Sequence, residues 1–317
     1  MIIELQRKNS PHVGFGECVV AEYFGDTGAT VKTDLERTLH FLKNWDDIFA
    51  IESLNRLLKH DLKIRNSARS AIIMAFYDLV GKELGVPLHK LWGFTPPSSL
   101  ISAFTIGIDT PEIVRKKAET AKNFPLIKIK LGSEKDVELL EIIKSVTNAR
   151  FIVDANCGWT PAKLQSIMNT LKDLGVELIE QPFPPSEEQG YRKLKETSSI
   201  PIFADESLGT VSDLKKIEPL FHGINIKLVK CGGLYEALSM IHAARALDLK
   251  IMIGCMIESS ISISAASHLT PAADFIDLDG NILITNDPFE GTKNTFGKLE
   301  LSSDPGIGVK KSIHCQK

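Results

Sequence analysis

From about residue 100 onward the chain alternates short apolar runs with helix-like stretches, and this alternation limits the fold more than any other feature. The runs are eight strand candidates: Ser102–Ile108, Leu126–Leu131, Phe151–Asn156, Val176–Glu180, Pro201–Asp205, Gly223–Leu228, Lys250–Met256 and Phe275–Asp279. Strands separated by helices form β-α units, which pair in a parallel sheet, and eight such strands close into a barrel. An open doubly wound sheet is the alternative, but Ile106–Asp109 is not a Gly-rich nucleotide turn. The sequence therefore predicts an α/β fold, a TIM-type (β/α)7β barrel.

The strand candidates show which side chains face the interior of such a barrel. In Leu126–Leu131 the isoleucines alternate with lysines, and successive side chains of a strand point to opposite faces. The outer face of a barrel packs on helices and must be apolar, so the polar face looks inward near the carboxyl ends of the strands. The polar residues placed there are Lys128, Lys130, Asn225, Lys227, Asp277 and Asp279.

Residues 1–100 follow a different pattern. Strand-like segments at Met1–Glu4 and Val13–Val20 precede helical stretches near Asp34–His60 and Ser67–Leu84, and the last stretch stops at Gly85-Val86-Pro87. We predict a small α+β capping domain over residues 1–100, completed by about residues 290–317, and a barrel over residues 101–289.

Composition excludes several classes of protein. The net charge of −3 comes from 40 acidic and 37 basic residues in no long block, which disfavours nucleic acid as a partner. No apolar run reaches the roughly 18 residues of a membrane span. The five cysteines have no C-x-x-C spacing, as expected for reduced thiols in a cytoplasmic protein.

Three carboxylates end three successive strands. Lys130, Asp154, Glu180, Asp205 and Lys227 follow one another at intervals of 24, 26, 25 and 22 residues, about one β-α unit each. At that period they lie side by side around a barrel mouth, where mutual repulsion of the carboxylates calls for a cation. Oxygen ligands, few in number, favour Mg²⁺ over zinc, with one ion per subunit.

Lys130 and Lys227 flank this predicted metal site. Lysine is a poor base at its usual pKa of about 10.4, but near a cation, a second lysine and a dry barrel mouth its pKa could fall to about 7–8. Two bases on opposite faces of one carbon can remove a proton from one side and return it from the other. Mg²⁺ would hold the substrate carboxylate and stabilise an enediolate.

These residues also carry a family resemblance. Lys128-Ile129-Lys130, Asp154-Ala155-Asn156, Ile179-Glu180-Gln181-Pro182, Ala204-Asp205-Glu206-Ser207, Lys227–Gly233 and Met74–Leu79 resemble the muconate-lactonizing-enzyme subgroup of the enolase superfamily. The resemblance implies that Lys130 and Lys227 are the catalytic bases, that Asp154, Glu180 and Asp205 bind Mg²⁺, and that Lys128 neutralises the substrate carboxylate.

Asp277-Leu278-Asp279 narrows the expected reaction. It resembles the Asp-x-Asp of dipeptide epimerases of the L-Ala-D/L-Glu epimerase type, in which it is suited to the free α-ammonium group of a dipeptide. Gly254–Glu258 ends without a histidine, which argues against the mandelate-racemase and sugar-acid dehydratase subgroups. An N-acylamino-acid racemase, an o-succinylbenzoate synthase and a catalytically silent binding relative remain open.

Other features are interpreted more simply. Only about a dozen residues precede Gly14, where the resemblance implies a further strand and a mobile loop, so we expect a reduced cap or a start assigned late. Lys230 and His268 are interpreted as structural residues, and Asn156 and Glu206 as partners of the site residues. The sequence identifies no particular dipeptide and leaves a homo-oligomer open.

Overall fold

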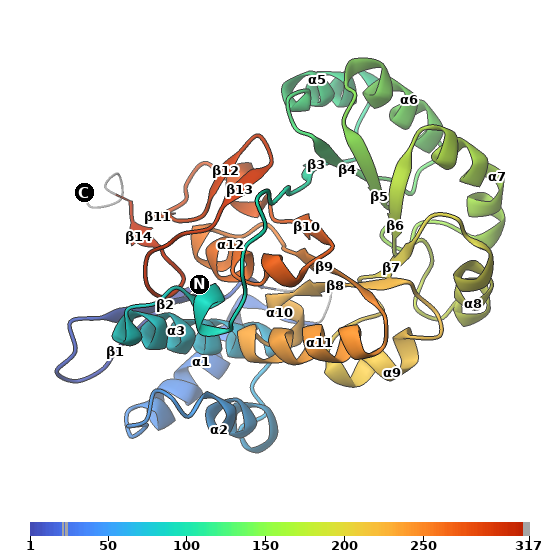
Figure 1. Cartoon of the computed structure of the whole chain (residues 1–317). Coiled ribbons are helices and arrows are strands. Elements are labelled where there is room, and N and C mark those ends of the chain that lie inside the picture. Colours follow the sequence, from blue (N-terminus) through green and yellow to red (C-terminus); the bar gives the residue numbers. More distant parts are fainter. Residues whose placement is uncertain (21, 23–24, 313–317) are drawn as a thin grey trace.

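The barrel of the predicted (β/α)7β fold is present in the computed structural model, which describes residues 1–20, 22 and 25–312. Within these residues eight strands form one parallel sheet in sequential order (Figure 1). They are β3 (Phe104–Ile106), β4 (Leu126–Lys130), β5 (Arg150–Asp154), β6 (Val176–Glu180), β7 (Ile202–Ala204), β8 (Gly223–Lys227), β9 (Lys250–Gly254) and β10 (Phe275–Asp277). A parallel bridge between Ser102 and Ile276 brings the first and last strands together. The fold prediction is therefore confirmed.

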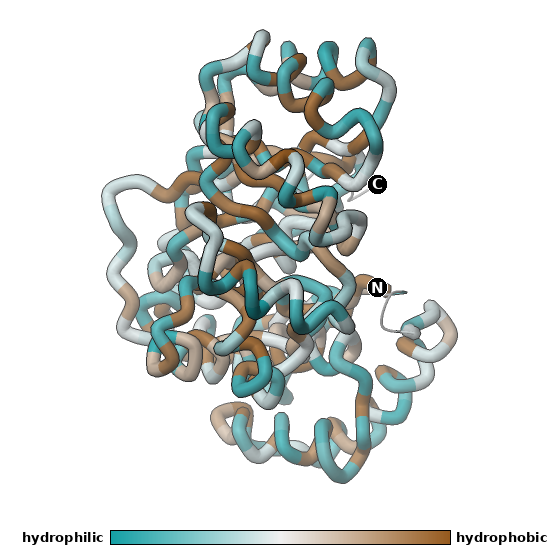
Figure 2. Tube along the Cα trace, turned by 90° about the vertical axis from the view of Figure 1, so that its right-hand side faces the viewer, coloured by the Kyte–Doolittle hydropathy of each residue, from teal (hydrophilic) through white to brown (hydrophobic). Residues whose placement is uncertain are grey.

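Helices connect the strands and cover the outside of the barrel. They are α5 (Pro111–Ala121), α6 (Asp136–Val146), α7 (Pro161–Asp173), α8 (Glu188–Thr197), α9 (Leu214–Ile217), α10 (Leu228–Cys231), α11 (Leu234–Ala246) and α12 (Ser260–Ser267). Thr110 and Thr160 cap α5 and α7 with their side chains, and proline occupies the first turn of each, where its missing N–H is harmless. Figure 2 shows apolar and polar residues alternating along the helical coils. In α7 the buried residues Leu164, Ile167 and Leu171 recur at helical spacing and form one apolar stripe.

The inner face of the barrel changes character along its axis. At the amino ends of the strands, inward side chains form a separate buried apolar cluster: Ala103, Leu126, Ile152, Leu178, Phe203 and Met252. Two residues further along β4 and β5 the same face carries Lys128 and Asp154, both buried. Because side chains alternate with period two, one strand supplies both the apolar floor and the charged layer above it.

The N-terminal part contains an antiparallel hairpin and helices. β1 (Ile2–Gln6) pairs with β2 (Val13–Glu17), as predicted for a strand-like start. The helices are α1 (Gly28–Leu42), α2 (Ile51–Arg56) with a π-helical turn at Leu57–Asp61, α3 (Asn66–Leu84) and α4 (Leu88–Leu91). Helix α3 ends at Gly85 with φ 71°, the left-handed conformation that glycine adopts without strain. Most of α3 is buried, which explains its apolar residues on all sides.

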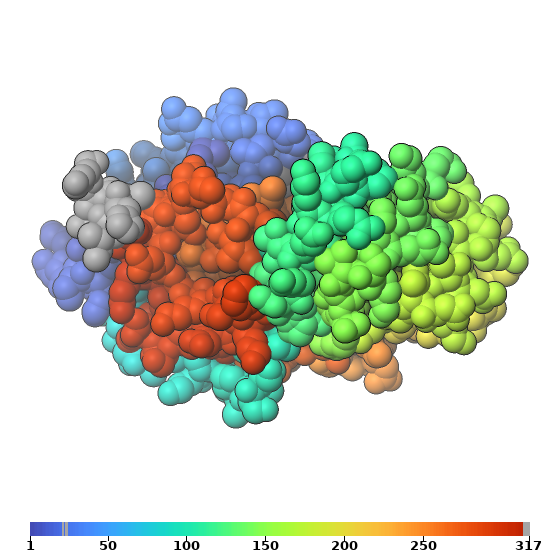
Figure 3. Space-filling view, turned by 90° about the horizontal axis from the view of Figure 1, so that it is seen from above, coloured from blue at the N-terminus to red at the C-terminus, as the bar shows by residue number. Residues whose placement is uncertain are grey.

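The C-terminal residues return to the N-terminal part. They contain β11 (Phe289–Glu290), β12 (Lys293–Thr295), β13 (Lys298–Glu300) and β14 (Lys310–Lys311). Short 3-10 turns occur earlier, at Val211–Asp213 and Thr270–Ala272 within the barrel and at Gly280–Leu283 after β10. The amide of Ile307 donates to Asp78 Oδ1 over 2.9 Å, and Lys311 pairs with Glu4 over 2.7 Å. Figure 3 shows this segment in red beside both the blue N-terminal residues and the green barrel units. The boundaries at residues 100 and 289 stay a prediction.

Two predictions from composition concern the chain as a whole. None of the helices in residues 1–20, 22 and 25–312 is long and apolar enough to cross a membrane. Cys18, Cys157, Cys231 and Cys255 are free thiols. Cys315 lies outside the described residues.

Candidate active site

Strand register brings the three predicted metal ligands together. Lys130 of β4 lies beside Asp154 of β5, which lies beside Glu180 of β6. Asp205 follows the end of β7. One carboxylate oxygen from each of Asp154, Glu180 and Asp205 lies within 4.8 Å of the other two, and the three residues are 0–4% exposed. The sequence interval of one β-α unit therefore translates into a compact triad of carboxylates.

The two predicted bases lie at the two ends of this triad. Lys130 Nζ is 2.6 Å from Asp154 Oδ2 and donates to Asn156 Oδ1 over 2.9 Å. Lys227 Nζ donates to Asp205 Oδ2 over 2.9 Å. The Lys130 side chain is 28% exposed and that of Lys227 only 6%. Since β4 and β8 flank the strands that supply the triad, the two amines approach the site from opposite sides.

Lys128 occupies the floor of the site. Its Nζ lies 3.0 Å from Asp154 Oδ2, 2.7 Å from Glu180 Oε2 and 2.8 Å from Asp277 Oδ2, and its side chain is 2% exposed. Burial lowers its pKa, but attraction to Asp277 and Glu180 outweighs burial and raises that pKa well above the usual range. Lys128 is therefore a fixed cation that links the triad to Asp277. Its predicted contact with a substrate carboxylate stays a prediction.

The triad fits a divalent cation with oxygen ligands. Burial and repulsion from Asp154 raise the pKa of Glu180 to about 7. Glu180 Oε2 has the Lys128 ammonium nearby, but accepts no well-directed hydrogen bond from the described residues. Asp154 and Asp205 are also buried, yet attraction to Lys128 and Lys130 at Asp154, and to Lys227 and Lys230 at Asp205, lowers the pKa of both carboxyls. Crowded carboxylates with an unsatisfied oxygen are the ligands that Mg²⁺ prefers.

The expected fall in lysine pKa presumes a bound cation, and the protein's own groups shift the pKa of Lys227 the other way. Burial lowers its pKa, but attraction to Asp205 outweighs burial, so the pKa lies above its usual range. The strand pattern placed Lys227 in a dry site, but could not show that Asp205 Oδ2 would lie only 2.9 Å from its Nζ. A carboxylate at hydrogen-bond distance stabilises the charged amine more than burial destabilises it.

Among the residues that the structure describes, Asp277 and Asp279 each keep one oxygen that accepts no strong hydrogen bond. Asp277 Oδ2 is held by Lys128, whereas its Oδ1 has no hydrogen-bond partner among the described residues. Asp279 Oδ2 accepts the amide of Thr105 over 2.7 Å, and the weakly donating Cys255 thiol lies 4.0 Å from its Oδ1. Both aspartates are 4% exposed. Two buried carboxylate oxygens without strong donors are suited to a cationic group.

Two further residues contact the triad in ways that the sequence analysis did not predict. Lys230, interpreted as structural, donates to the Asp205 carbonyl over 2.7 Å and also contacts Asp205 Oδ1. Asn225 Nδ2 donates to Glu180 Oε1 over 2.7 Å. A Cβ on Gly254 would lie 2.3 Å from Asn225 Oδ1, so glycine makes room for this amide. The strand alternation predicts that Asn225 points into the barrel. It could not predict that Lys230, which lies in the helical turn α10 after the strand, would contact Asp205.

Asn156 and Glu206 form a second layer around Lys130. Asn156 accepts from Lys130 and donates to Glu206 Oε1 over 3.0 Å. Asn156 has φ 41° and Gln181 has φ 37°, and such left-handed backbone in non-glycine residues concentrates at functional sites. The interpretation of Asn156 and Glu206 as partners of the site residues agrees with these contacts.

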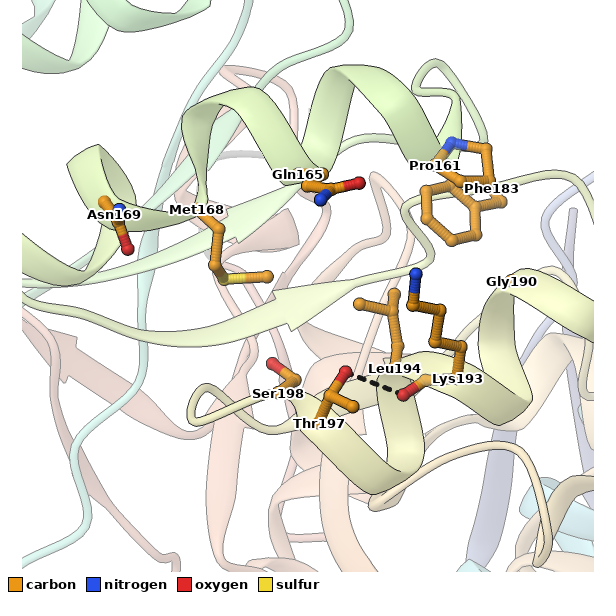
Figure 4. A pocket seen from close by; sticks show the side chains of 10 residues that line it. All are labelled: Pro161, Gln165, Met168, Asn169, Phe183, Gly190, Lys193, Leu194, Thr197 and Ser198. Carbon is orange, nitrogen blue, oxygen red and sulfur yellow. Dashed lines mark hydrogen bonds between the residues drawn. The ribbon is translucent and has the colours of Figure 1, made fainter.

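Two other features lie apart from the barrel mouth. His268 is buried and stacks on His89 with 5.2 Å between ring centroids, as expected for a structural histidine. A groove of about 490 Å³ lies between α7 and α8 on the outside of the barrel, where Met168, Leu194 and Lys193 line it (Figure 4). Neither feature contributes to the carboxylate triad.

Comparison with known proteins finds relatives of both parts of the chain. Residues 7–93 match the mandelate racemase / muconate lactonizing enzyme N-terminal domain, and residues 112–312 match the enolase C-terminal domain-like family. An L-Ala-D/L-Glu epimerase of Bacteroides thetaiotaomicron is 42% identical over 300 residues, which are 94% of this chain and 78% of that protein. An N-acetyl-D-glutamate racemase of a Pseudoalteromonas species is 36% identical over 222 residues, 70% of each chain.

A solved structure of similar fold contains ligands. The dipeptide epimerase of Methylococcus capsulatus, complexed with Mg and the dipeptide L-Arg-D-Lys, is similar with a TM-score of 0.89 and 33% identity. The similarity covers 97% of this chain and 90% of that one. The two family matches together cover both the capping part and the barrel. The chain therefore belongs to the mandelate racemase / muconate lactonizing enzyme family of the enolase superfamily.

Proposed function

We propose that this protein is a Mg²⁺-dependent dipeptide epimerase, an isomerase that inverts the α-carbon of the C-terminal residue of a dipeptide. The observation that carries the proposal is a pair of buried carboxylate oxygens: Asp277 Oδ1, which has no hydrogen-bond partner among the described residues, and Asp279 Oδ1, which has a weak thiol donor. Lys128 joins Asp277 to the carboxylate triad. A dipeptide has one cationic and one anionic end, and this site offers a partner for each. The relatives named as epimerases support the same reaction.

Lys130 and Lys227 are proposed as the two bases of a 1,1-proton transfer. Their approach from opposite ends of the triad allows one lysine to take the α-proton while the other returns a proton to the opposite face. Asp154, Glu180 and Asp205 would hold one Mg²⁺, which when bound supplies positive charge to the substrate carboxylate and so makes the α-proton more acidic. Lys128 adds a second positive charge on the same side.

The carboxylates also decide the protonation of these bases. Asp205 holds the proton on Lys227 when its negative charge is uncompensated. Sharing that charge with a divalent cation weakens the attraction and favours the neutral amine that a base requires. We therefore expect the Lys227 amine to be neutral near pH 7, and so able to accept a proton, only when the metal is bound.

Racemisation of N-acylated amino acids is the second candidate. The relative named N-acetyl-D-glutamate racemase supports this alternative. An N-acyl substrate has no ammonium group, so it would bring no charged donor to these aspartates, leaving Asp277 Oδ1 without a partner among the described residues and Asp279 Oδ1 with a weak thiol donor. An o-succinylbenzoate synthase substrate has the same deficiency.

A substrate screen separates these functions. Free dipeptides and N-acetyl or N-succinyl amino acids are incubated with Mg²⁺ in deuterated water, and α-proton exchange is followed by NMR. We expect exchange at the C-terminal residue of free dipeptides, lost on chelation. If the α-protons of N-acyl amino acids exchange faster than those of every dipeptide, the protein is an N-acylamino-acid racemase and the dipeptide proposal is wrong. Absence of exchange in all substrates would favour the catalytically silent relative.

The cysteines bear on the location of the protein. We propose a cytoplasmic protein because its described cysteines are free thiols. A homo-oligomer stays open, and size-exclusion chromatography with light scattering measures it.

A further inference from the structure

The short helix α10 connects a proposed base to a proposed metal ligand. Lys227 ends β8, and α10 (Leu228–Cys231) follows at once with all four residues buried. Lys230 returns from α10 and contacts Asp205 Oδ1, while Lys227 holds Asp205 Oδ2. The two oxygens of Asp205 are thus assigned to two lysines three residues apart. The orientation of this carboxylate follows from the position of α10.

The cap helix α3 holds the outer side of α10. Asn66 Nδ2 donates to the Lys230 carbonyl over 2.6 Å. Arg69 Nη2 donates to the Cys231 carbonyl over 3.2 Å and to Asn66 Oδ1 over 2.6 Å. Arg69 is 1% exposed, and its Nη1 pairs with Glu236 of α11 over 3.0 Å. Two carbonyls at the end of α10, which no further turn of helix satisfies, are therefore bound by the cap.

Glycine at position 232 permits this contact. Its φ of 96° turns the chain out of α10, and a Cβ there would lie 2.2 Å from Arg69 Nη2. Because the buried guanidinium is held by both Glu236 and Asn55, it cannot move aside without losing these contacts, and a side chain at this position would separate α3 from α10. Gly232 therefore serves the docking of the cap on α10 as well as the turn at the end of this helix.

We propose that Asn66 and Arg69 are positioning residues for the metal site, which act on Asp205 through α10 and Lys230. This inference rests on the proposed function only in requiring that Asp205 binds Mg²⁺. The capping part thereby contributes to the metal centre without supplying a ligand. We call the hydrogen bonds from Asn66 and Arg69 to the carbonyls of α10 the clamp. A variant without the clamp keeps every carboxylate and lysine of the site but loses the restraint on their geometry.

The test measures Mg²⁺ affinity by calorimetry in the absence of substrate. Asn66→Ala and Arg69→Lys both keep the net charge, so a change in affinity cannot come from long-range electrostatics. The matched control is Ser259→Ala, which removes the 2.7 Å hydrogen bond from Ser259 to Glu17 of β2 and so breaks another contact between the cap and the barrel. Loss of a hydrogen bond that restrains the site weakens binding by about three- to tenfold. We expect this change for both clamp variants and less than a twofold change for the control.

A double-mutant cycle then tests the route through Lys230. Asn66→Ala should have no further effect on Mg²⁺ affinity in a Lys230→Met background, because the restraint no longer reaches Asp205. If Arg69→Lys does not fold, Asn66→Ala decides alone, since it leaves the Arg69–Glu236 pair intact. Unchanged Mg²⁺ affinity in Asn66→Ala, or additive effects in the cycle, would overturn the inference. Wild-type protein that binds Mg²⁺ but epimerises no dipeptide would overturn only the proposed function, whereas failure to bind Mg²⁺ would overturn both.

Discussion

Replacing Asp279 by asparagine tests the proposed ammonium site most directly. Asp279 Oδ2 accepts the Thr105 amide, and an asparagine oxygen can accept the same amide, so the variant should fold. What it loses is the charge on the free Oδ1. A hydrogen bond to a charged group contributes about 1.5–3 kcal/mol, which corresponds to about a 10- to 150-fold change in affinity. Because Asp277 still carries its own charge, we expect an effect at the lower end of this range, with the KM for dipeptides raised about tenfold.

The pH dependence adds a second measurement on the same residue. Burial and repulsion from Asp277 raise the pKa of Asp279 to about 6. The ionised carboxylate binds the ammonium, so the KM of the wild-type protein should rise as the pH falls through about 6. The Asp279→Asn variant has no group to ionise at this position. Its KM should therefore lack the part of the rise at low pH that comes from protonation of Asp279.

Steady-state kinetics with free dipeptides from pH 5 to pH 8 measure both effects. α-Proton exchange at saturating substrate serves as the internal reference, because it should change less than KM. The matched control is Asp274→Asn. Asp274 lies just before β10, at the end of the strand away from the barrel mouth, and its carboxylate pairs with Arg245 at a distance of 2.9 Å. An Asp279→Asn variant whose KM and pH profile equal those of the wild type would refute the ammonium assignment.

Three further predictions concern the bases, the metal and the fold. Lys130→Ala and Lys227→Ala should each lose epimerisation by about 10²- to 10⁴-fold yet exchange the α-proton of one epimer in deuterated water, and exchange of both epimers by either variant would contradict the two-base account. Glu180→Gln should abolish calorimetric Mg²⁺ binding, and retention of full activity would contradict the triad as metal site. Burial lowers the pKa of His268 from 6.5 to about 4, so the unfolded state binds the proton first and stability falls as the pH drops below 6.5. Urea unfolding should show about 2 kcal/mol lost between pH 7 and pH 5, with a smaller loss in His268→Phe.

The strands and the charged face of the barrel could be predicted because they depend on local periodicity. The alternation in Ile127–Leu131 fixes which residues of β4 point inward, and the interval of one β-α unit from Asp154 to Glu180 to Asp205 fixes which residues lie side by side. Both follow from chain geometry, since a strand has a period of two and parallel strands start from the same edge. The barrel and its triad of carboxylates are therefore contained in the sequence pattern.

Distances between groups that are remote in the sequence were decided by the tertiary structure alone. The pattern placed Lys128 inward but not its contacts with three carboxylates, among them Asp277, which is 149 residues away. It did not show that Asp205 would raise the pKa of Lys227, or that the cap would reach Lys230 through Asn66. Electrostatic energies change steeply over the last few ångströms between charges, whereas periodicity specifies only the face on which a side chain lies. The sequence determined which residues meet at the barrel mouth, and only packing decided how closely they meet and which of them are left with a free oxygen.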